Sequence, residues 1–444
     1  MKKLFLIIAV ISLAACTTVR KAREAQNPTN VPPGERTVTA AEAGLGTNSV
    51  LTLARALNIA ERFHPTIVEA NQNLEIATAQ LVEARAGRQP SVGANAGYQR
   101  ATANAAGAPA SSKSKNAYNA ALTADLLLFD FGKTPALIRG ALAQKLAAQE
   151  ELRAAQIDTE FNVRVAFFTL SQNAELMQVA EETVRQYGVH LTQVQGLFEV
   201  GKRIKYDITK AQVDLGNAEL ALINASNSVT TARAVLNLSM GLAEDPGYRL
   251  GESPHEEAVT DLATLMRSAR EHQPQLHALQ QQVNAASAAV DVAIADLYPS
   301  FSLQGSFGWS GGHFPLMWNW SAAADAAMSV FDGGTHYGKI TEAAAQLRAA
   351  RARQAANEQQ IYSDLSQAVT KLDGAKQRLT LTELIVRQAR ESLDLASERY
   401  RLGLATAVDQ ADAQAALATA RSQQVQARYD VLNQMAAIRH TVGE

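Results

Sequence analysis

One stretch of the chain occurs twice. Residues 197–212 read LFEVGKRIKYDITKAQ and residues 399–414 read RYRLGLATAVDQADAQ, with Gly, Asp, Ala and Gln at matching places 202 positions apart (399 − 197). A repeat at so long a period indicates a duplicated structural unit, and it restricts the fold more than any local pattern does. We therefore expect two similar halves.

The repeat continues upstream with a second spacing. His64 corresponds to Gln273 and Pro90 to Pro299 at a spacing of 209 (273 − 64), whereas Phe129 corresponds to Phe331 at a spacing of 202 (331 − 129). The first half therefore carries seven more residues (209 − 202) between Pro90 and Phe129. Such a length difference predicts a longer surface loop.

Around each copy, apolar and small residues recur every seven positions. The series is Met177, Val184, Leu191 and Phe198 before the first copy, and Leu379, Val386, Leu393 and Tyr400 before the second. This period is typical of antiparallel coiled coils, and the accompanying alanines allow close helix approach. From Pro135, a favourable first helical residue, the pattern predicts a helix to about residue 197, roughly 90–95 Å long.

Each copy is predicted to be the turn where a long helix reverses into a shorter one. Gly201 and Gly403 are placed to end the long helices as C-cap glycines. Asp207 and Asp409 follow at positions where a carboxylate favours the start of the next helix.

After Pro90 and Pro299 the pattern changes to a period of two. From Tyr118 and from Trp318, apolar even-numbered positions alternate with polar odd-numbered ones, and the first strand, around 92–102, is the least regular. An apolar face, a polar face and aromatic residues near the ends are typical of transmembrane β-strands of about 9–11 residues. A periplasmic β-hairpin packed on helices is the alternative.

Four membrane strands cannot close a barrel, and an open sheet edge cannot lie in lipid with unpaired backbone groups. The chain is therefore expected to combine its strands with those of other copies. Two copies would give about eight strands, the smallest membrane barrel, and three would give about twelve, which leaves room for a pore.

The first residues, MKKLFLIIAVISLAAC, have the charge and apolar run of a secretory signal peptide and are too short for a stable membrane span. Cys16, the only cysteine of the chain, follows Leu13-Ala14-Ala15 and resembles the lipidated cysteine of bacterial lipoproteins. An incidental thiol is the alternative. The Pro- and Gly-containing segment to Asn48 shows no period and is expected to be an extended tether.

Several classes of function receive no support. The net charge of −2 and the absence of a Lys/Arg run give no sign of nucleic-acid binding. Residues 308–312 read GWSGG and fit the G-x-S-x-G motif of hydrolases. A nucleophile elbow needs a strand before the motif and a helix after it. Here the motif lies at the predicted end of a β-hairpin. The eight histidines are scattered, and His272 and His277 are five apart, which is wrong for a helical metal pair. We expect no enzyme, no cofactor and no metal site.

The order of these motifs, found twice, resembles the TolC family of outer-membrane efflux proteins, in its lipidated branch. The resemblance covers about residues 50–440 and is carried by LFDFGK (128–133), FEVGKRIKYD (198–207), LYPSFSLQG (297–305), VFDGG (330–334) and YRLGLATAVDQADAQ (400–414). It implies an α+β membrane protein with a tandem-repeat fold. Four β-strands per chain would contribute to a trimeric twelve-stranded barrel, continued by a long α-helical coiled-coil tunnel in the periplasm.

The resemblance also fixes expected boundaries. They are a signal peptide at 1–15, a lipidated tether at 16–50, a first repeat at 51–250 and a second repeat at 251–444. Within each repeat a helix, a β-hairpin, a long helix, a tip turn and a return helix follow one another. The hairpins are expected at about 91–130 and 300–332, and the tip turns at about 199–206 and 401–408.

In this family aspartates on the inner helix pair form rings in the periplasmic constriction, and Asp409 and Asp412 stand in these positions. Such rings would admit cations, and repulsion between close carboxylates would raise some of their pKa values. Ordinary helix-start acids are the alternative. Tyr400 matches the inner tyrosine whose hydrogen bond to Asp207 would lock the closed tip.

A second lock of the family, an arginine two residues after the inner glycine, is absent because this chain has Ala405; Arg203 could substitute. The tip contacts offered to the periplasmic adaptor would be Val200, Gly201, Lys202, Leu402, Gly403 and Leu404.

The implied function is the outer-membrane channel of a tripartite efflux pump. It would be a homotrimer in the outer membrane that works with a periplasmic adaptor and a proton-driven inner-membrane pump, and it would export small amphiphilic compounds. The alternatives are the outer-membrane conduit of a type I protein secretion system and a lipid-anchored coiled-coil spacer without a pore.

Overall fold

The computed structural model describes residues 18–20, 22–26, 31–46, 49–102, 115–251 and 261–444. It divides into two compact units. Unit 1 comprises Met1–Ala70, Arg153–Gln273 and Ile361–Glu444, and unit 2 comprises Asn71–Leu152 and Pro274–Gln360.

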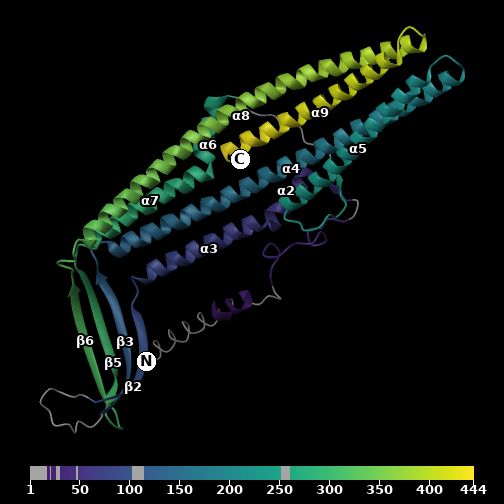
Figure 1. The fold of residues 1–444 in the computed structure, drawn as a ribbon. Helices are drawn as coiled ribbons and strands as arrows, with labels where there is room; N and C mark the ends of the chain where they lie inside the picture. Colours follow the sequence, from purple (N-terminus) through teal and green to yellow (C-terminus); the bar gives the residue numbers. More distant parts are fainter. Residues whose placement is uncertain (1–17, 21, 27–30, 47–48, 103–114, 252–260) are drawn as a thin grey trace. The chain divides into compact units, whose positions relative to one another are not determined.

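The same order of elements occurs twice along the chain (Figure 1). The first half contains α2 (Leu53–Phe63), α3 (Pro65–Ala86), β2 (Ser91–Ala101), β3 (Lys115–Phe129), α4 (Lys133–Glu199) and α5 (Lys205–Ser239). The second contains α6 (Leu262–His272), α7 (Pro274–Ala295), β5 (Ser300–Gly311), β6 (Met317–Ala327), α8 (Thr335–Arg401) and α9 (Ala407–Val442). Because α4 and α8 both have 67 residues and α3 and α7 both have 22, the halves are a duplication.

The helix before each hairpin is in fact two helices, although the sequence analysis expected one. His64 and Gln273 have extended backbone, with ψ angles of 124° and 109°, between an 11-residue and a 22-residue helix. The residue before a proline is forced out of the helical region, so Pro65 and Pro274 each begin a new helix.

The long helices α4 and α8 far exceed the usual size of a globular helix. At about 1.5 Å per residue, 67 residues correspond to roughly 100 Å of helix. Ion pairs one turn apart lie on their surfaces, such as Arg164 with Glu160 and Arg401 with Glu398. Within the described ranges, no helix has both the length and the apolarity that crossing a bilayer requires.

The strands of unit 2 form one antiparallel sheet in the order β2-β3-β5-β6 (Figure 1). The two hairpins therefore join through β3 and β5 at its centre. A Cβ at Gly308 of β5 would lie 2.4 Å from the carbonyl oxygen of Ala120 in β3, so only glycine fits at this contact. Among the described residues β2 and β6 each pair on one side alone, which leaves two unpaired sheet edges.

Two of the sequence motifs form the junctions from strand to helix in unit 2. In LFDFGK the Asp130 carboxylate accepts hydrogen bonds from the backbone amide of Thr134 at 2.6 Å and from its hydroxyl at 2.5 Å. In VFDGG the Asp332 carboxylate accepts from the amide of His336 at 2.7 Å. Each aspartate thus caps the first turn of a long helix, α4 or α8, which explains why the motif occurs twice.

The core of unit 1 gathers residues from both halves of the chain. Its largest buried side chains are Tyr248, Tyr429, Phe167, Phe168, Leu51, Leu170, Leu236 and Met240. Tyr429 of α9 donates a hydrogen bond to Glu175 of α4 at 2.7 Å, and Arg428 forms an ion pair with the same carboxylate. Near the end of α9, Nε2 of His440 lies 2.6 Å from Oδ1 of Asp158 in α4. The two repeats are thus joined by polar contacts as well as by apolar packing.

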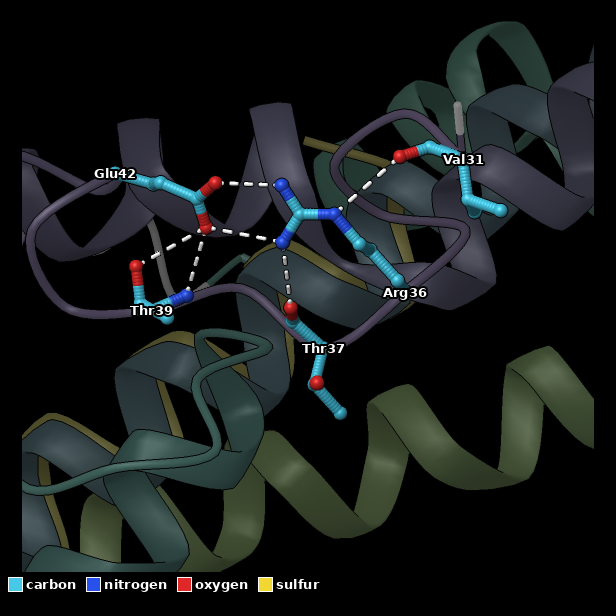
Figure 2. Close-up of polar contacts among 5 residues, drawn as sticks. All are labelled: Val31, Arg36, Thr37, Thr39 and Glu42. Atoms are coloured by element: carbon cyan, nitrogen blue, oxygen red, sulfur yellow. Dashed lines mark hydrogen bonds and ion pairs between the residues drawn. The ribbon is translucent and has the colours of Figure 1, made fainter. Parts of the chain in front are cut away.

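Residues 31–46 are not the extended tether that the sequence suggested. Val38 and Leu45 are buried in the core of unit 1, with exposures of 1% and 3%. Figure 2 shows that Glu42 pairs with the Arg36 guanidinium and accepts hydrogen bonds from the amide and hydroxyl of Thr39. These bonds lower the pKa of Glu42 to about 2. The sequence shows no period here because the segment is fixed by single buried side chains and one ion pair, not by a regular element.

Candidate functional site at the helix turns

The two turns between long and short helices lie at the same end of unit 1 (Figure 1). We call residues 200–204 tip 1 and residues 402–406 tip 2. Both end the preceding helix with the same pair of backbone hydrogen bonds, which is the Schellman arrangement. The bonds run from Lys202 to Leu197 (2.8 Å) and from Gly201 to Phe198 (2.9 Å) in tip 1, and from Leu404 to Arg399 (2.8 Å) and from Gly403 to Tyr400 (3.1 Å) in tip 2.

The glycine of each tip has a backbone that other residues rarely adopt. The φ angles are +72° at Gly201 and +76° at Gly403, as predicted for C-cap glycines. A Cβ built at either position meets nothing within 4 Å. Any side chain would therefore be strained by its backbone and not by its neighbours, and the space in front of each glycine is open.

The helices that follow the two tips begin differently. Thr406 is the N-cap of α9, and its hydroxyl accepts a hydrogen bond from the Asp409 amide at 3.2 Å, while the Asp409 carboxylate accepts from the Thr406 amide at 2.7 Å. This is a complete capping box. Ile204 at the start of α5 has no side chain that can cap. The hydrogen bonds from Thr406 lower the pKa of Asp409.

Asp409 thus caps the start of α9. This is the helix-start role that the sequence left open as the alternative to a charged ring. Its partner in the predicted ring, Asp412, is exposed and lies one turn further along α9. Buried Tyr187 of α4 has its pKa raised chiefly by burial, and the charges of Asp214 and Asp412 raise it further. Asp412 therefore acts on the contact between α4 and α9, whereas the carboxylate of Asp409 is held in its own helix start.

Tyr400 joins the two helix pairs, but not through the hydrogen bond that was expected. The side chain is 4% exposed and packs with Val194 of α4, Ala211 of α5 and Ala407 of α9. In the described part of the chain its hydroxyl has no hydrogen-bond partner, so the predicted bond to Asp207 is not formed. Burial raises the pKa of Tyr400, the charge of Arg203 opposes this rise, and the charge of the half-buried Asp207 adds to it.

Arg203, the predicted substitute for the arginine that is absent at Ala405, lies over the ring of Tyr400. Its guanidinium carbon lies 4.3 Å from the centre of the Tyr400 ring. A guanidinium over an aromatic face is held by a cation–π interaction, about 0.5–1 kcal/mol at exposed sites and more when desolvated. The Arg203 guanidinium thus links tip 1 to the end of α8 through the face of the Tyr400 ring.

His190 of α4 was not predicted from the sequence as a site residue. It is 2% exposed, its ring centre lies 5.6 Å from that of Tyr400, and no described residue bonds its Nδ1 atom. Position 190 is three residues after Tyr187 and four before Val194, so it lies on the face of the buried seam. The sequence could have revealed His190 through this position, because a histidine on a buried helix face is a candidate for a buried titratable group.

The predicted adaptor-docking residues form an exposed apolar rim. Val200, Leu402 and Leu404 have exposures of 67%, 63% and 67%. Gly201, Lys202 and Gly403 are exposed beside them. Docking at this rim remains a prediction.

The structure also bears on the G-x-S-x-G segment and on metal binding. The G-x-S-x-G segment lies at the end of β5 and is followed by β6 and not by a helix, so it lacks the geometry of a nucleophile elbow. Across the residues that the structure describes, no group of three His, Cys, Asp or Glu side chains could hold a metal ion. Cys16 lies outside the described residues.

The chain matches one protein family over most of its length. The family described as "Outer membrane efflux protein" matches residues 56–242 and 265–444. These two matched segments correspond to the two repeats.

Individual relatives agree with this match. The chain is 25% identical over 381 residues to outer membrane protein OprJ of Pseudomonas aeruginosa, which covers 82% of this chain and 78% of that protein. It is 22% identical over 310 residues to the toluene efflux pump outer membrane protein TtgI of Pseudomonas putida, covering 68% and 66%. Its fold is similar to the outer membrane protein VceC of Vibrio cholerae, with a TM-score of 0.79, 20% identity and coverage of 88% and 96%.

Proposed function

Because the chain belongs to the outer membrane efflux protein family, we propose that it is the outer-membrane channel of a tripartite efflux pump that exports small amphiphilic compounds. The observation that carries the proposal is an incomplete sheet and two long helix hairpins in one duplicated chain. A four-stranded sheet with two unpaired edges needs further strands in a membrane. Three copies would supply twelve strands, enough for a water-filled lumen.

Unpartnered apolar residues on the helices of unit 1 support assembly with further copies. On α5, Val213, Leu220 and Ile223 are exposed, and on α8, Leu381, Leu384 and Leu395 are exposed. The spacings are seven (220 − 213) and three (223 − 220) on α5, and three (384 − 381) and fourteen (395 − 381), which is two heptads, on α8. These spacings are those of a coiled-coil seam. In a closed ring α5 of one copy would pack on α8 of the next, which is a heterologous interface.

The partners follow from the same architecture. A periplasmic adaptor would dock on the exposed rim of the two tips, and a proton-driven inner-membrane pump would deliver the cargo to it. Lipid attached to Cys16 would hold the N-terminus in the outer membrane, because several acyl chains give stable anchoring where one alone does not.

At the periplasmic mouth, copies of Asp412 would place carboxylates around the constriction. A ring of fixed negative charge admits cations and retards anions. Asp409 would add its charge to this ring while keeping its capping role. Reversal potentials of Asp412→Asn channels in planar bilayers should show lower cation selectivity than those of the parent.

The cargo is inferred from chemistry and from relatives. No cluster of metal ligands was found in the described residues, and TtgI is named for toluene efflux. The name of TtgI favours small organic compounds as the cargo. A type I protein secretion system is the second candidate, since a wide conduit contacts its cargo weakly.

Deletion of the gene, followed by complementation with the full chain, tests the proposal. Sensitivity to dyes, detergents, antibiotics and metals should rise for amphiphilic organic compounds on deletion and return on complementation. Unchanged sensitivity together with loss of a secreted protein would favour type I secretion.

A Cys16→Ser variant separates a channel from a spacer. A channel with membrane strands should still resist extraction as an integral protein and should run as a trimer. Complete release from the membrane would favour a lipid-anchored coiled-coil spacer.

A further inference from the structure

A buried histidine lies where the two helix pairs of unit 1 meet. His190 of α4 contacts the ring of Tyr400, and Arg203 stacks at 4.3 Å on the same ring. Three polar atoms at this level, Nδ1 of His190, the hydroxyl of Tyr400 and Oδ2 of Asp214, are buried with no hydrogen-bond partner among the described residues. Buried polar groups without partners are rare in folded proteins, and each one requires a physical explanation.

Charged groups act on His190 from two neighbouring elements. Helix α5 contributes Asp207, Lys210 and Asp214, and tip 1 contributes Arg203. Two acids and two bases thus offset each other, and Lys210 is already paired with Asp214 at 2.5 Å. The aromatic Tyr400 comes from α8, and α9 contributes the uncharged Ala407.

We propose that His190 is a positioning residue for the contact between Tyr400 and Arg203, and that a proton taken up by its imidazole releases this contact and opens the tips. This inference rests on the proposed function, because opening of the tips lets cargo pass only if the chain forms a channel. It assigns to this chain a gate that responds to mild acid.

Burial explains the direction of the response. The imidazolium form would be desolvated, and this lowers the pKa of His190 below its ordinary value, with Arg203 and Lys210 also lowering it and Asp214 and Asp207 opposing them. An opened tip exposes the imidazole to water and returns its pKa to about 6.5. The closed form is therefore fully stable above this pH, and it is lost as the pH falls below it, because protons bind the open form preferentially.

The size of the effect is bounded by the number of protons. One group per chain shifts the balance of closed and open forms by at most about tenfold for each pH unit. An imidazolium at the tip is also repelled by the charge of Arg203, which already lowers the pKa of His190. Asp214 offers it an acceptor on α5, since this carboxylate has the strongest charge effect on His190 and an unbonded oxygen.

The test is the conductance of the purified full-length protein in planar bilayers between pH 7.5 and 5.5. The open probability of the parent channel should rise below about pH 6.5, by up to about tenfold per pH unit for each chain whose tip opens independently. His190→Phe keeps a ring against Tyr400 but cannot take up a proton, so it should remain closed across this range. Asp409, whose pKa is lowered by its cap, stays charged throughout and does not contribute.

Two further variants serve as controls. His313→Gln removes an exposed histidine in the loop between β5 and β6, and the acid response should persist. Tyr400→Phe removes only the unbonded hydroxyl and should behave as the parent does, whereas Tyr400→Ala should open the tips at every pH. An acid response that survives in His190→Phe, or one that disappears in His313→Gln, would overturn the proposal.

Hydrogen exchange separates failure of the gate from failure of the proposed function. After correction for intrinsic rates, amides of tip 1 and tip 2 should exchange faster at pH 5.5 than at 7.5 in the parent, and equally at both in His190→Phe. This result without conductance would contradict the channel and retain the gate. Conductance with a pH-independent tip would contradict the gate and retain the channel.

Discussion

Tip 1 and tip 2 share one backbone turn and differ in how the next helix begins. Both place a glycine with positive φ after a long helix and close it with the same two hydrogen bonds. Only tip 2 continues into a capping box, because Thr406 stands where tip 1 has Ile204. The glycine turn is therefore common to both copies, whereas the capping box is present only in tip 2.

The difference changes what the equivalent aspartates can do. The Asp409 carboxylate accepts hydrogen bonds from the Thr406 amide at 2.7 Å and from the Thr406 hydroxyl at 2.8 Å. Asp207 has the same place in its helix, but in the described residues its carboxylate has no hydrogen-bonded partner, and its charge acts on Tyr400 and His190. One aspartate stabilises its own helix and the other acts on the contact between helix pairs.

The largest expected effect comes from removing the feature that the tips share. Gly201→Val or Gly403→Val places a β-branched residue at positive φ, which costs at least about 1–2 kcal/mol. The side chain also fills the open space in front of the glycine. Pull-down of the adaptor should weaken more than about tenfold, while trimers remain intact on native gels.

Gly196→Val is the matched control, because Gly196 is also exposed with nothing within 4 Å but lies inside α4. It should bind the adaptor like the parent. Export at the normal level by both tip variants would contradict the role of the rim.

The next effect comes from removing the feature found only in tip 2. Thr406→Ile gives tip 2 the residue of tip 1 and should destabilise the start of α9 by about 1 kcal/mol. Hydrogen-exchange protection over 406–412 should fall about fivefold, with tip 1 unchanged. Equal protection in variant and parent would show that the cap adds no stability there.

The reciprocal change should have a smaller effect of opposite sign. Asp207 already lies three residues after Ile204, so Ile204→Thr supplies the one missing member of a capping box. The start of α5 should gain about 0.5–1 kcal/mol, measured as slower exchange over 204–210. The captured carboxylate would also act less on His190, so the acid response should change with it. Unaltered exchange would mean that the backbone of tip 1 cannot form the box.

The smallest effect is a difference in acid sensitivity. The pKa of Asp409 is lowered by its bonds to Thr406, so the cap contributes stability above the ordinary aspartate pKa and loses it as the pH falls through the lowered value. Between pH 5 and pH 3, the protection of the amides over 406–412, after correction for intrinsic exchange rates, should therefore fall. Thr406→Ile, which has no such cap, should not show this fall.

The repeated motifs could be interpreted correctly before the structure because each acts locally. Gly201 and Gly403 were predicted as C-caps, and both adopt the required backbone. The alternation after Pro299 predicted the strands of the second hairpin, which run to 311 and 327. A positive φ or a two-residue period follows from a residue and its near neighbours, and these are visible in a sequence.

Contacts between distant segments were harder to predict. The expected bond from Tyr400 to Asp207 was inferred from matching positions, yet the ring instead stacks with Arg203, and no described residue bonds its hydroxyl. Residues 31–46 looked like a tether, although Val38 and Leu45 belong to the core. Nothing in the local pattern says which distant side chains will surround such residues.

The sequence by itself determined that this protein is a duplicated chain of long helices and membrane-type strands, with a glycine turn in each half. Tertiary structure alone decided that β3 pairs with β5 and that His190 is buried against Tyr400. The physical reason is that periods and turn residues express short-range backbone preferences. Burial and pairing instead depend on which surfaces meet after the chain has folded.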